Sequence, residues 1–221
     1  MSEEKSTSVV RCPEPFVPLF QEAERIMAGF FSEMQREPEK GQLTIGGSRY
    51  LLMRADSFSF ELHEELRKTF GEAGARQIRY KIARALGRRD ARAYHERLGV
   101  TDPHMKLALG PVHFAHVGWA FVDIFPESRP APDDTYFLTY SHPYSFEAEA
   151  HLSHGLRSKF PVCSMNSGYS SGWCEVSYGV ELEAQEITCR AMGHADCIFV
   201  MAPPKTIGAF VRQYKEKFGV T

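Results

Sequence analysis

The chain has 221 residues, of which 43% are hydrophobic and 24% are charged, proportions that are ordinary for a soluble globular protein. This length allows one sizeable domain with its own hydrophobic core, with or without a small accessory segment. The formal net charge of −2 excludes a global basic field that would favour nucleic acid or an anionic membrane as a partner.

The sequence shows no sign of export or of a membrane span. No apolar run approaches the roughly 20 residues of a membrane helix, and the polar N-terminus, MSEEKSTSVV, lacks the apolar core of a secretory signal. We therefore expect a cytoplasmic protein that contacts neither membrane nor nucleic acid directly. The five cysteines are an odd number, and a reducing compartment favours free thiols or metal ligands over disulfides.

The N-terminal part begins with residues 1 to about 12, which we expect to be disordered. A short helix is predicted in the next segment, PFVPLFQEAERIMAGFFSEMQREPEKG. Its phenylalanines are Phe16, Phe20, Phe30 and Phe31. Either this helix packs on its own core, or it is an arm that packs on a second subunit, because so many aromatic residues in a short element suggest a missing partner.

Two helices are expected after a hairpin. The segment QLTIGGSRYLLMRA indicates two short strands around a turn at Gly46 and Gly47. The helix after this hairpin is expected to end at Gly71. A longer helix is predicted from about residue 72 to residue 98. The apolar face of this longer helix is expected to consist of Ile78, Ile82 and Leu86.

The second half of the chain alternates predicted strands and helices. Residues 112–124 are dense in β-branched and aromatic residues and predict a strand that pairs with a second strand at 134–142. A further strand pair is predicted around a turn at residues 192–194. Helices are expected at 145–157, 162–178 and 205–218. This alternation favours a single α/β domain of the α+β type, with a mixed or antiparallel sheet flanked by helices.

Three thiols and one carboxylate gather near the C-terminal strand pair. Glu186 and Cys189 lie near the end of one strand, and Cys197 begins the returning strand. Together with Cys163 they offer three thiolates and a carboxylate, which can close a tetrahedral, structural zinc site. The alternative is that these cysteines are simply buried, as free cysteine often is. His194, on the turn, is a competing ligand.

Three stretches, FPVCSMNSGYSSGWC, ITCRAMGHADC and GPVHF, resemble the sensory domain of XylR- and DmpR-type activators of aromatic catabolism. The similarity runs from about residue 40 to residue 202 and is strongest at SFE (145–147), PVC (161–163) and CRAMGH (189–194). The resemblance implies an XylR N-terminal segment joined to a 4-vinyl reductase domain, a homodimer and an aromatic effector in a buried pocket. It also implies one structural zinc ion, with the ligands Cys163, Glu186, Cys189 and Cys197.

The resemblance divides the chain into three parts. They are a partly disordered arm for dimerisation (1–40), the ligand-binding domain (41–203) and a C-terminal helix (204–221) that could lead to an output module. The implied function is that of a sensor, not an enzyme, which regulates sigma-54-dependent transcription through an ATPase module absent from this chain. One alternative is a stand-alone enzyme that uses the pocket histidines His113, His116 and His142 together with Glu147. Another is an assembly scaffold.

The pocket of such a sensor needs mostly apolar walls with a few placed polar groups. The candidate wall residues are Phe114, His116, Trp119, Phe121, Tyr136, Leu138, Tyr140, His142, Phe146, Tyr169 and Trp173. Where phenol sensors of the family carry a histidine that binds the phenolic hydroxyl, this chain has Phe114, and where they carry a tryptophan it has His142. Either His113 or His116 takes the polar role, or the ligand lacks that hydroxyl.

Overall fold

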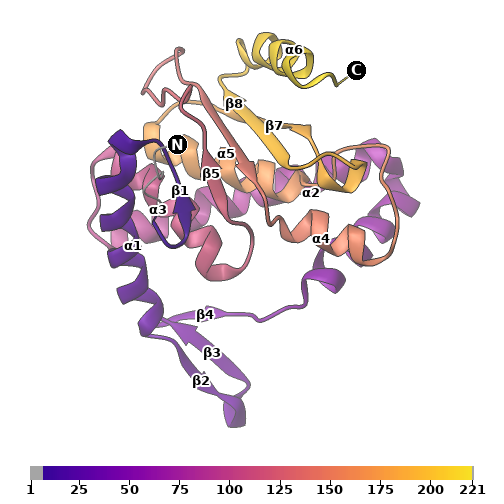
Figure 1. Ribbon diagram of the computed structural model, residues 1–221. Helices are drawn as coiled ribbons and strands as arrows, with labels where there is room; N and C mark the ends of the chain where they lie inside the picture. Colours follow the sequence, from indigo (N-terminus) through magenta and orange to yellow (C-terminus); the bar gives the residue numbers. More distant parts are fainter. Residues whose placement is uncertain (1–6, 221) are drawn as a thin grey trace.

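A mixed sheet of five strands, with helices on both faces, forms the centre of the protein in a computed structural model that describes residues 7–220 (Figure 1). In spatial order the strands are β1 (Val10–Arg11), β5 (Val122–Ile124), β6 (Leu138–His142), β8 (Cys197–Ala202) and β7 (Glu183–Thr188). β1 and β5 are parallel, and the other neighbouring pairs are antiparallel. The prediction of an α+β domain with a mixed sheet is confirmed.

Helices cover the two faces of this sheet unequally (Figure 1). The α-helices are α1 (Val17–Ser32), α2 (Leu62–Arg97), α3 (Pro103–Val117), α4 (Phe146–Ser153), α5 (Ser164–Tyr178) and α6 (Ile207–Phe218). Along β8, Phe199 and Met201 belong to the main core shared with α3 and α5, whereas Val200 and Ala202 pack with α6 on the other face. This alternation is the ordinary period of two along a strand, and it places the main core on the side of α3 and α5.

A second, smaller sheet projects from the body next to the end of α1 (Figure 1). Its strands are β2 (Gln35–Glu37), β3 (Gln42–Ile45) and β4 (Ser48–Tyr50). The turn between β3 and β4 has positive φ at both Gly46 (55°) and Gly47 (75°), as a two-residue hairpin requires. The predicted hairpin is therefore confirmed. Gly71 also departs from helical geometry, with φ 70° and ψ 172°, and divides the helical segment around α2.

The predicted strand at residues 112–124 is wrong for its first half, because residues 112–117 belong to helix α3. Capping explains this helix. The Asp102 carboxylate accepts a hydrogen bond from the Met105 amide at 2.7 Å, Pro103 occupies the first turn, and Gly118 ends the helix with φ 76°. Only Val122–Ile124 form a strand, β5, which pairs with β6 as expected. The terminal signals override the β propensity of the aromatic run.

The apolar face predicted for the long helix is also wrong. Ile82 and Leu86 are 51% and 42% exposed, whereas the buried residues in the middle of α2 include Ala75, Ala83, Gly87 and Ala91. The reason is the close packing of α2 against α5. A Cβ atom added at Gly172 of α5 would lie 2.1 Å from the Arg84 carbonyl oxygen of α2, so the two backbones approach too closely for large side chains.

The N-terminal segment is more ordered than expected. Residues 1–6 lie outside the described residues, but Val10 and Cys12 are buried and β1 pairs with β5. Phe20 and Phe30 of the predicted arm are buried in the main core of the same chain. The helix therefore packs on its own core, and these side chains give no argument for a second subunit.

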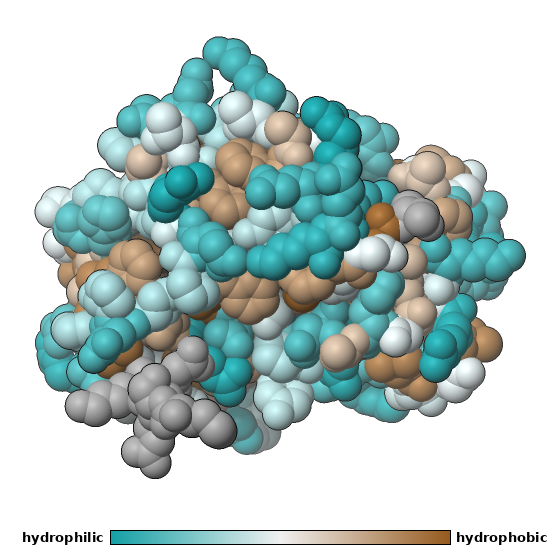
Figure 2. Space-filling model, turned by 45° about the horizontal axis from the view of Figure 1, so that its top comes forward, coloured by the Kyte–Doolittle hydropathy of each residue, from teal (hydrophilic) through white to brown (hydrophobic). Residues whose placement is uncertain are grey.

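Helix α6 lies on the side of the sheet opposite α5 and closes a small second core with Phe137 and Val200. Figure 2 shows a face on which hydrophilic residues predominate and hydrophobic residues form only small patches. Among residues 7–220, no helix combines the length and the apolar character that crossing a bilayer requires.

Candidate functional site: a metal centre beside an aromatic cavity

The fold brings the predicted metal ligands together at one end of the sheet. One donor atom from each of Cys163, Glu186, Cys189 and Cys197 lies within 4.8 Å of all the others. The register shift in β7 between Glu186 and Thr188 lies at this end of the strand, and Cys163 lies directly before the first turn of α5. The site thus joins the C-terminal strand pair to a helix that is distant in sequence.

The geometry and the surroundings of this cluster fit a tetrahedral metal ion. The sulfur atoms of Cys163 and Cys197 are 3.6 Å apart, close to the roughly 3.8 Å expected for two thiolates about 2.3 Å from one zinc ion. The Glu186 Oε2 atom accepts a hydrogen bond from the Cys163 amide, while its buried Oε1 atom has no hydrogen-bond partner among the described residues. That free oxygen is available to a cation.

Polar neighbours hold the sulfur atoms in place. The Ser145 hydroxyl is 3.1 Å from the Cys163 sulfur and accepts a hydrogen bond from the Asn166 amide group at 2.9 Å. The Arg190 amide donates to the Cys197 sulfur at 3.4 Å. Donors of this kind orient metal ligands and stabilise their charge.

The protonation states of the three thiols and of Glu186 depend on their burial and on the hydrogen bonds between them. Burial raises the pKa of Cys163 and of Glu186 well above their usual ranges. Hydrogen bonds from the neighbouring thiols lower the pKa of Cys189 to about 2. The protein alone therefore favours one thiolate among protonated neighbours, and a divalent cation would supply the positive charge that ionises the rest.

His194, the competing ligand, makes a different contact. Its Nδ1 atom is 3.1 Å from the backbone of Cys189, which leaves it outside the group of four donors. Cys163, Glu186, Cys189 and Cys197 are the set that the described residues place within mutual reach.

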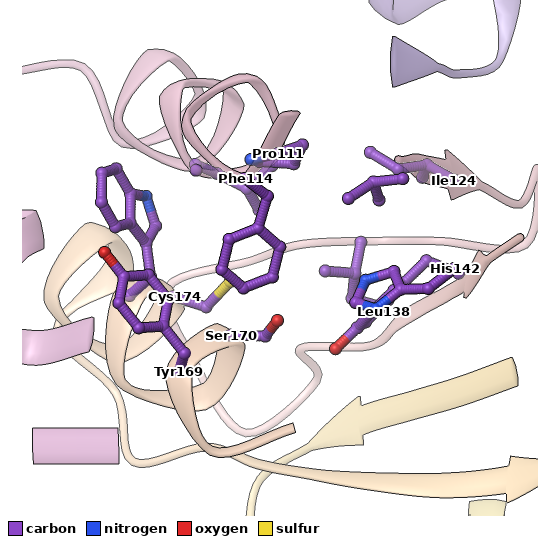
Figure 3. A pocket seen from close by; sticks show the side chains of 13 residues that line it. Pro111, Phe114, Ile124, Leu138, His142, Tyr169, Ser170 and Cys174 are labelled. Carbon is purple, nitrogen blue, oxygen red and sulfur yellow. The ribbon is translucent and has the colours of Figure 1, made fainter. Parts of the chain in front are cut away.

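An aromatic cavity lies next to this cluster, between α3, α5 and the sheet (Figure 3). Pro111 and Phe114 come from α3, Ile124 from β5, and Leu138 and His142 from β6. The remaining lining residues are Leu107, Gly110, Val122, Tyr140, Tyr169, Ser170, Trp173 and Cys174. His142 is directly opposite the metal-cluster residue Cys197 in the register of β6 and β8, so the two sites share a strand pair.

Of the eleven candidate pocket residues, the structure places six on this wall. They are Phe114, Leu138, Tyr140, His142, Tyr169 and Trp173. Trp119 stands behind the wall and contacts the rings of Phe114 and Tyr169 at 5.5 and 4.9 Å. Phe146 contacts Trp119 from the outer side, with ring centroids 5.1 Å apart.

The other three candidates point elsewhere. His116 stacks on Phe31 of α1 at 4.6 Å, because residues 112–117 are helical and not extended. Phe121 lies against Tyr144 at the surface, and Tyr136 packs on Tyr178 at 5.3 Å. The structure does not place His116, Phe121 or Tyr136 on the cavity wall, so the predicted wall is wrong at these three positions.

The histidine expected to replace the missing polar group is neither His113 nor His116. His113 is buried behind the wall, where its ring contacts the rings of Tyr169 and Trp173 with centroids 5.8 and 5.4 Å apart. The imidazole on the wall belongs to His142, which is fully buried. Burial lowers the pKa of His142 to about 3, so its ring is neutral at physiological pH.

The polar groups of the cavity are concentrated on the β6 side. Neither ring nitrogen of His142 has a hydrogen-bond partner among the described residues, whereas the buried Tyr140 hydroxyl is paired with Ser170. The lining contains no Lys, Arg, Asp or Glu. A buried polar atom without a partner costs about 1–3 kcal/mol, so these atoms are suited to a ligand that supplies the partner.

Glu147 has a structural position and does not face the pocket histidines. Its carboxylate pairs with Arg79 at 2.7 Å and accepts hydrogen bonds from the amides of Met165 and Asn166 in the first turn of α5. Burial raises its pKa to about 7, against the opposing effect of Arg79. Arg79 also contacts His63, so this network fastens α5 to α2 and α4. The proposed acid–base pair of Glu147 with a histidine is not formed.

The sequence reasoning missed the wall residues that α3 contributes before Phe114. Leu107, Gly110 and Pro111 line the cavity because the helix begins at Pro103. The signal was present in Asp102-Pro103, a cap followed by proline at the first helical position. Ser170 and Cys174 were also missed, although they lie one residue from Tyr169 and Trp173 on the same helix.

Part of this chain matches a known protein family. Residues 30–126 match the family model described as "Activator of aromatic catabolism". The predicted resemblance to the sensory domain of these activators is confirmed.

Two relatives of this activator family extend the comparison. The phenol regulator MopR of Acinetobacter guillouiae is 25% identical over 167 residues, which are 76% of this chain and 30% of that protein. The chain therefore spans less than a third of that relative's length. The phenol-responsive sensory domain of the transcription activator PoxR, crystallised with phenol, has a TM-score of 0.72 and 21% identity, over 83% of this chain and 90% of that one.

A vinyl-4-reductase family protein from Methanocaldococcus jannaschii superposes more loosely, with a TM-score of 0.40 and 13% identity over 86% of this chain and 94% of that one. The matched family and its two relatives are described as activators or regulators. This agrees with the prediction that the domain is not an enzyme.

Proposed function

We propose that this domain is a sensor that binds a small, neutral aromatic molecule in the cavity between α3, α5 and β6. The observation that carries the proposal is the fully buried His142 on a mostly apolar wall, whose two ring nitrogens have no hydrogen-bond partner within residues 7–220. Buried polar atoms without partners lower the stability of a protein, so they are expected mainly at functional sites. A ligand with one hydroxyl or similar group would satisfy them.

The charge of the wall favours a neutral ligand. No lysine or arginine lines the cavity, and the His142 ring is uncharged because burial lowers its pKa to about 3. A carboxylate placed there would lose its hydration without gaining a cation, which is strongly unfavourable. We therefore expect phenols to bind and benzoates to be rejected.

One zinc ion is proposed at Cys163, Glu186, Cys189 and Cys197, supported by the mutual reach of their donor atoms and by the thiolate-rich set. When bound, the ion would act as a structural cross-link between the strand pair and α5. Because Cys163 precedes the helix that carries Tyr169 and Trp173, and Cys197 is opposite His142, this cross-link would hold two walls of the cavity in register.

Differential scanning fluorimetry and calorimetric titration with phenol, toluene and benzoate test the ligand proposal. Phenol is expected to raise the melting temperature and to bind more tightly than toluene, while benzoate has no effect. In the His142→Phe variant, phenol is expected to lose about 1–3 kcal/mol of binding free energy and toluene to lose none. The absence of binding by all three compounds, or equal binding of benzoate and phenol, would refute the proposal.

Transcription control through an output module and homodimer formation are further parts of the proposal. The first is supported by the match to activators of aromatic catabolism. The second is supported by the exposed apolar side chains of Ile82 and Leu86 on α2, and it is tested by light scattering of the Ile82→Glu, Leu86→Glu double variant. An unchanged dimer in this variant would exclude this face from the interface, and a monomeric parent protein would exclude the dimer.

A further inference from the structure

The ring of Phe114 extends from α3 into the middle of the cavity (Figure 3). Beside it, the remaining cavity volume is only about 30 Å³. An engineered apolar cavity of about 150 Å³ accepts benzene, whereas a water molecule needs roughly 10–15 Å³. A one-ring ligand therefore requires space that the wall side chains now fill.

The two large rings that α5 contributes to the wall are tethered. The Trp173 indole donates a hydrogen bond to the Lys106 carbonyl at 2.8 Å, and the Tyr169 hydroxyl donates to Asp90 at 2.8 Å. Phe114 has no polar tether. It is held by ring contacts alone, so it can turn without breaking a hydrogen bond.

Space for such a turn lies behind Phe114. Its ring stacks on Trp119 at 5.5 Å and 20°, and Trp119 is only half-buried. Beyond Trp119 is a surface groove of about 430 Å³. The groove is lined by Ser8, Val9, Ala55, Ala115, Gly118, Ala120, Phe121, Tyr144, Phe146, Glu149 and Ala150. Small residues form much of this lining, so a displaced ring would meet little resistance.

The backbone at Trp119 is fixed, so the movement must be a side-chain rotation. The Trp119 amide donates to the Phe114 carbonyl at 2.9 Å, and the Trp119 carbonyl accepts from the Phe146 amide at 3.0 Å. These two bonds hold the segment between α3 and α4 while leaving the indole free to turn toward the groove.

We propose that Phe114 is the residue that sets the ligand size of this cavity. A one-ring ligand takes the place of the Phe114 ring, which turns with the Trp119 indole toward the groove. This inference rests on the proposed function, because it concerns the same cavity. The ligand must overcome the lost packing of Phe114, so the wild-type protein binds more weakly than a variant in which the ring is absent.

Calorimetric titration with toluene tests the role of Phe114. The Phe114→Ala variant is expected to bind toluene at least tenfold more tightly than the parent, with Phe114→Leu in between. Phe137→Ala removes an equally buried ring in the second core and is expected to leave the affinity unchanged. If Phe114→Ala does not fold, Phe114→Leu gives the same comparison.

The outcomes separate the two claims. If toluene or phenol binds the parent protein and the Phe114 variants equally, or if Phe137→Ala improves affinity as much, the size-setting role of Phe114 is refuted while the sensor function stands. If neither compound binds the parent or any variant, both claims fall.

Tryptophan fluorescence gives a second readout, since the chain has two tryptophans, Trp119 and Trp173. Binding of toluene to the parent is expected to shift the emission, because Trp119 becomes more exposed. The Trp119→Phe variant retains Trp173 and is expected to bind toluene without this shift. The same shift in Trp119→Phe would show that Trp119 does not move, and would overturn the proposed displacement.

Discussion

Replacing His142 with phenylalanine is expected to stabilise the protein and to flatten its acid sensitivity. In the folded chain the imidazole is fully buried, and both of its nitrogens lack hydrogen-bond partners among the described residues. Phenylalanine removes these two polar atoms and fills part of the adjoining cavity. At pH 7.5 the free energy of unfolding should rise by about 1–3 kcal/mol, the usual cost of leaving a buried polar group unpaired.

The pH dependence follows from the same burial. Desolvation lowers the pKa of His142 from 6.5 to about 3, so between these values the unfolded chain binds one proton more than the folded chain. The free energy of unfolding therefore rises with pH across this window. The contribution of His142 is fully present above pH 6.5 and is lost as the pH falls toward 3. Between pH 7.5 and pH 5 this single histidine should account for a loss of about 2 kcal/mol.

Urea unfolding of the parent and the His142→Phe variant at pH 5, 6 and 7.5 measures both effects. The variant should lose about 2 kcal/mol less than the parent over this range. Proton-linked changes at the cysteine cluster and at His113 are common to both proteins and cancel in the comparison. A variant that is less stable at pH 7.5, or that keeps the parental slope, would refute this reasoning.

Three further substitutions probe the frame around the cavity. Cys189→Ala should abolish zinc binding in elemental analysis and lower the free energy of unfolding by several kcal/mol. Cys174→Ala should keep the metal and lower the free energy of unfolding by about 1 kcal/mol. Equal losses would mean that the wrong thiols were assigned. Arg79→Met leaves the buried Glu147 carboxylate unpaired and should cost about 3–5 kcal/mol in denaturant unfolding, and an unchanged midpoint would show that the carboxylate is protonated. Gly172→Ala should lower the melting temperature strongly, because its Cβ would lie 2.1 Å from a carbonyl oxygen of α2. An unchanged melting temperature would contradict the close packing of α2 and α5.

The candidate metal ligands could be chosen from the sequence because the arrangement of three of the four depends on local structure. Glu186, Cys189 and Cys197 lie on one strand pair, and a hairpin brings residues on either side of its turn together whatever surrounds it. The hairpin at Gly46 and Gly47 was predictable for the same reason, since two positive φ angles in succession favour glycine.

The cavity wall was only partly predictable, because it depends on whether residues 112–117 form a strand or a helix. Local propensity favoured a strand, but the cap at Asp102 and the left-handed Gly118 select a helix. The choice changes the side-chain period from 2.0 to 3.6 residues, which turns Phe114 into the cavity and His116 toward α1.

What the sequence alone determined, then, is each feature set by neighbouring residues: the hairpins β3–β4 and β7–β8 and the cysteine spacing. Only the tertiary structure decided which face of α2 is buried and which imidazole reaches the cavity. The first depends on glycines of α5, such as Gly172, which packs on Arg84 of α2 88 positions earlier. The second depends on the pairing of β6 with β8, which points His142 inward. Side-chain burial is decided by the partner surface, and that surface exists only after the chain has folded.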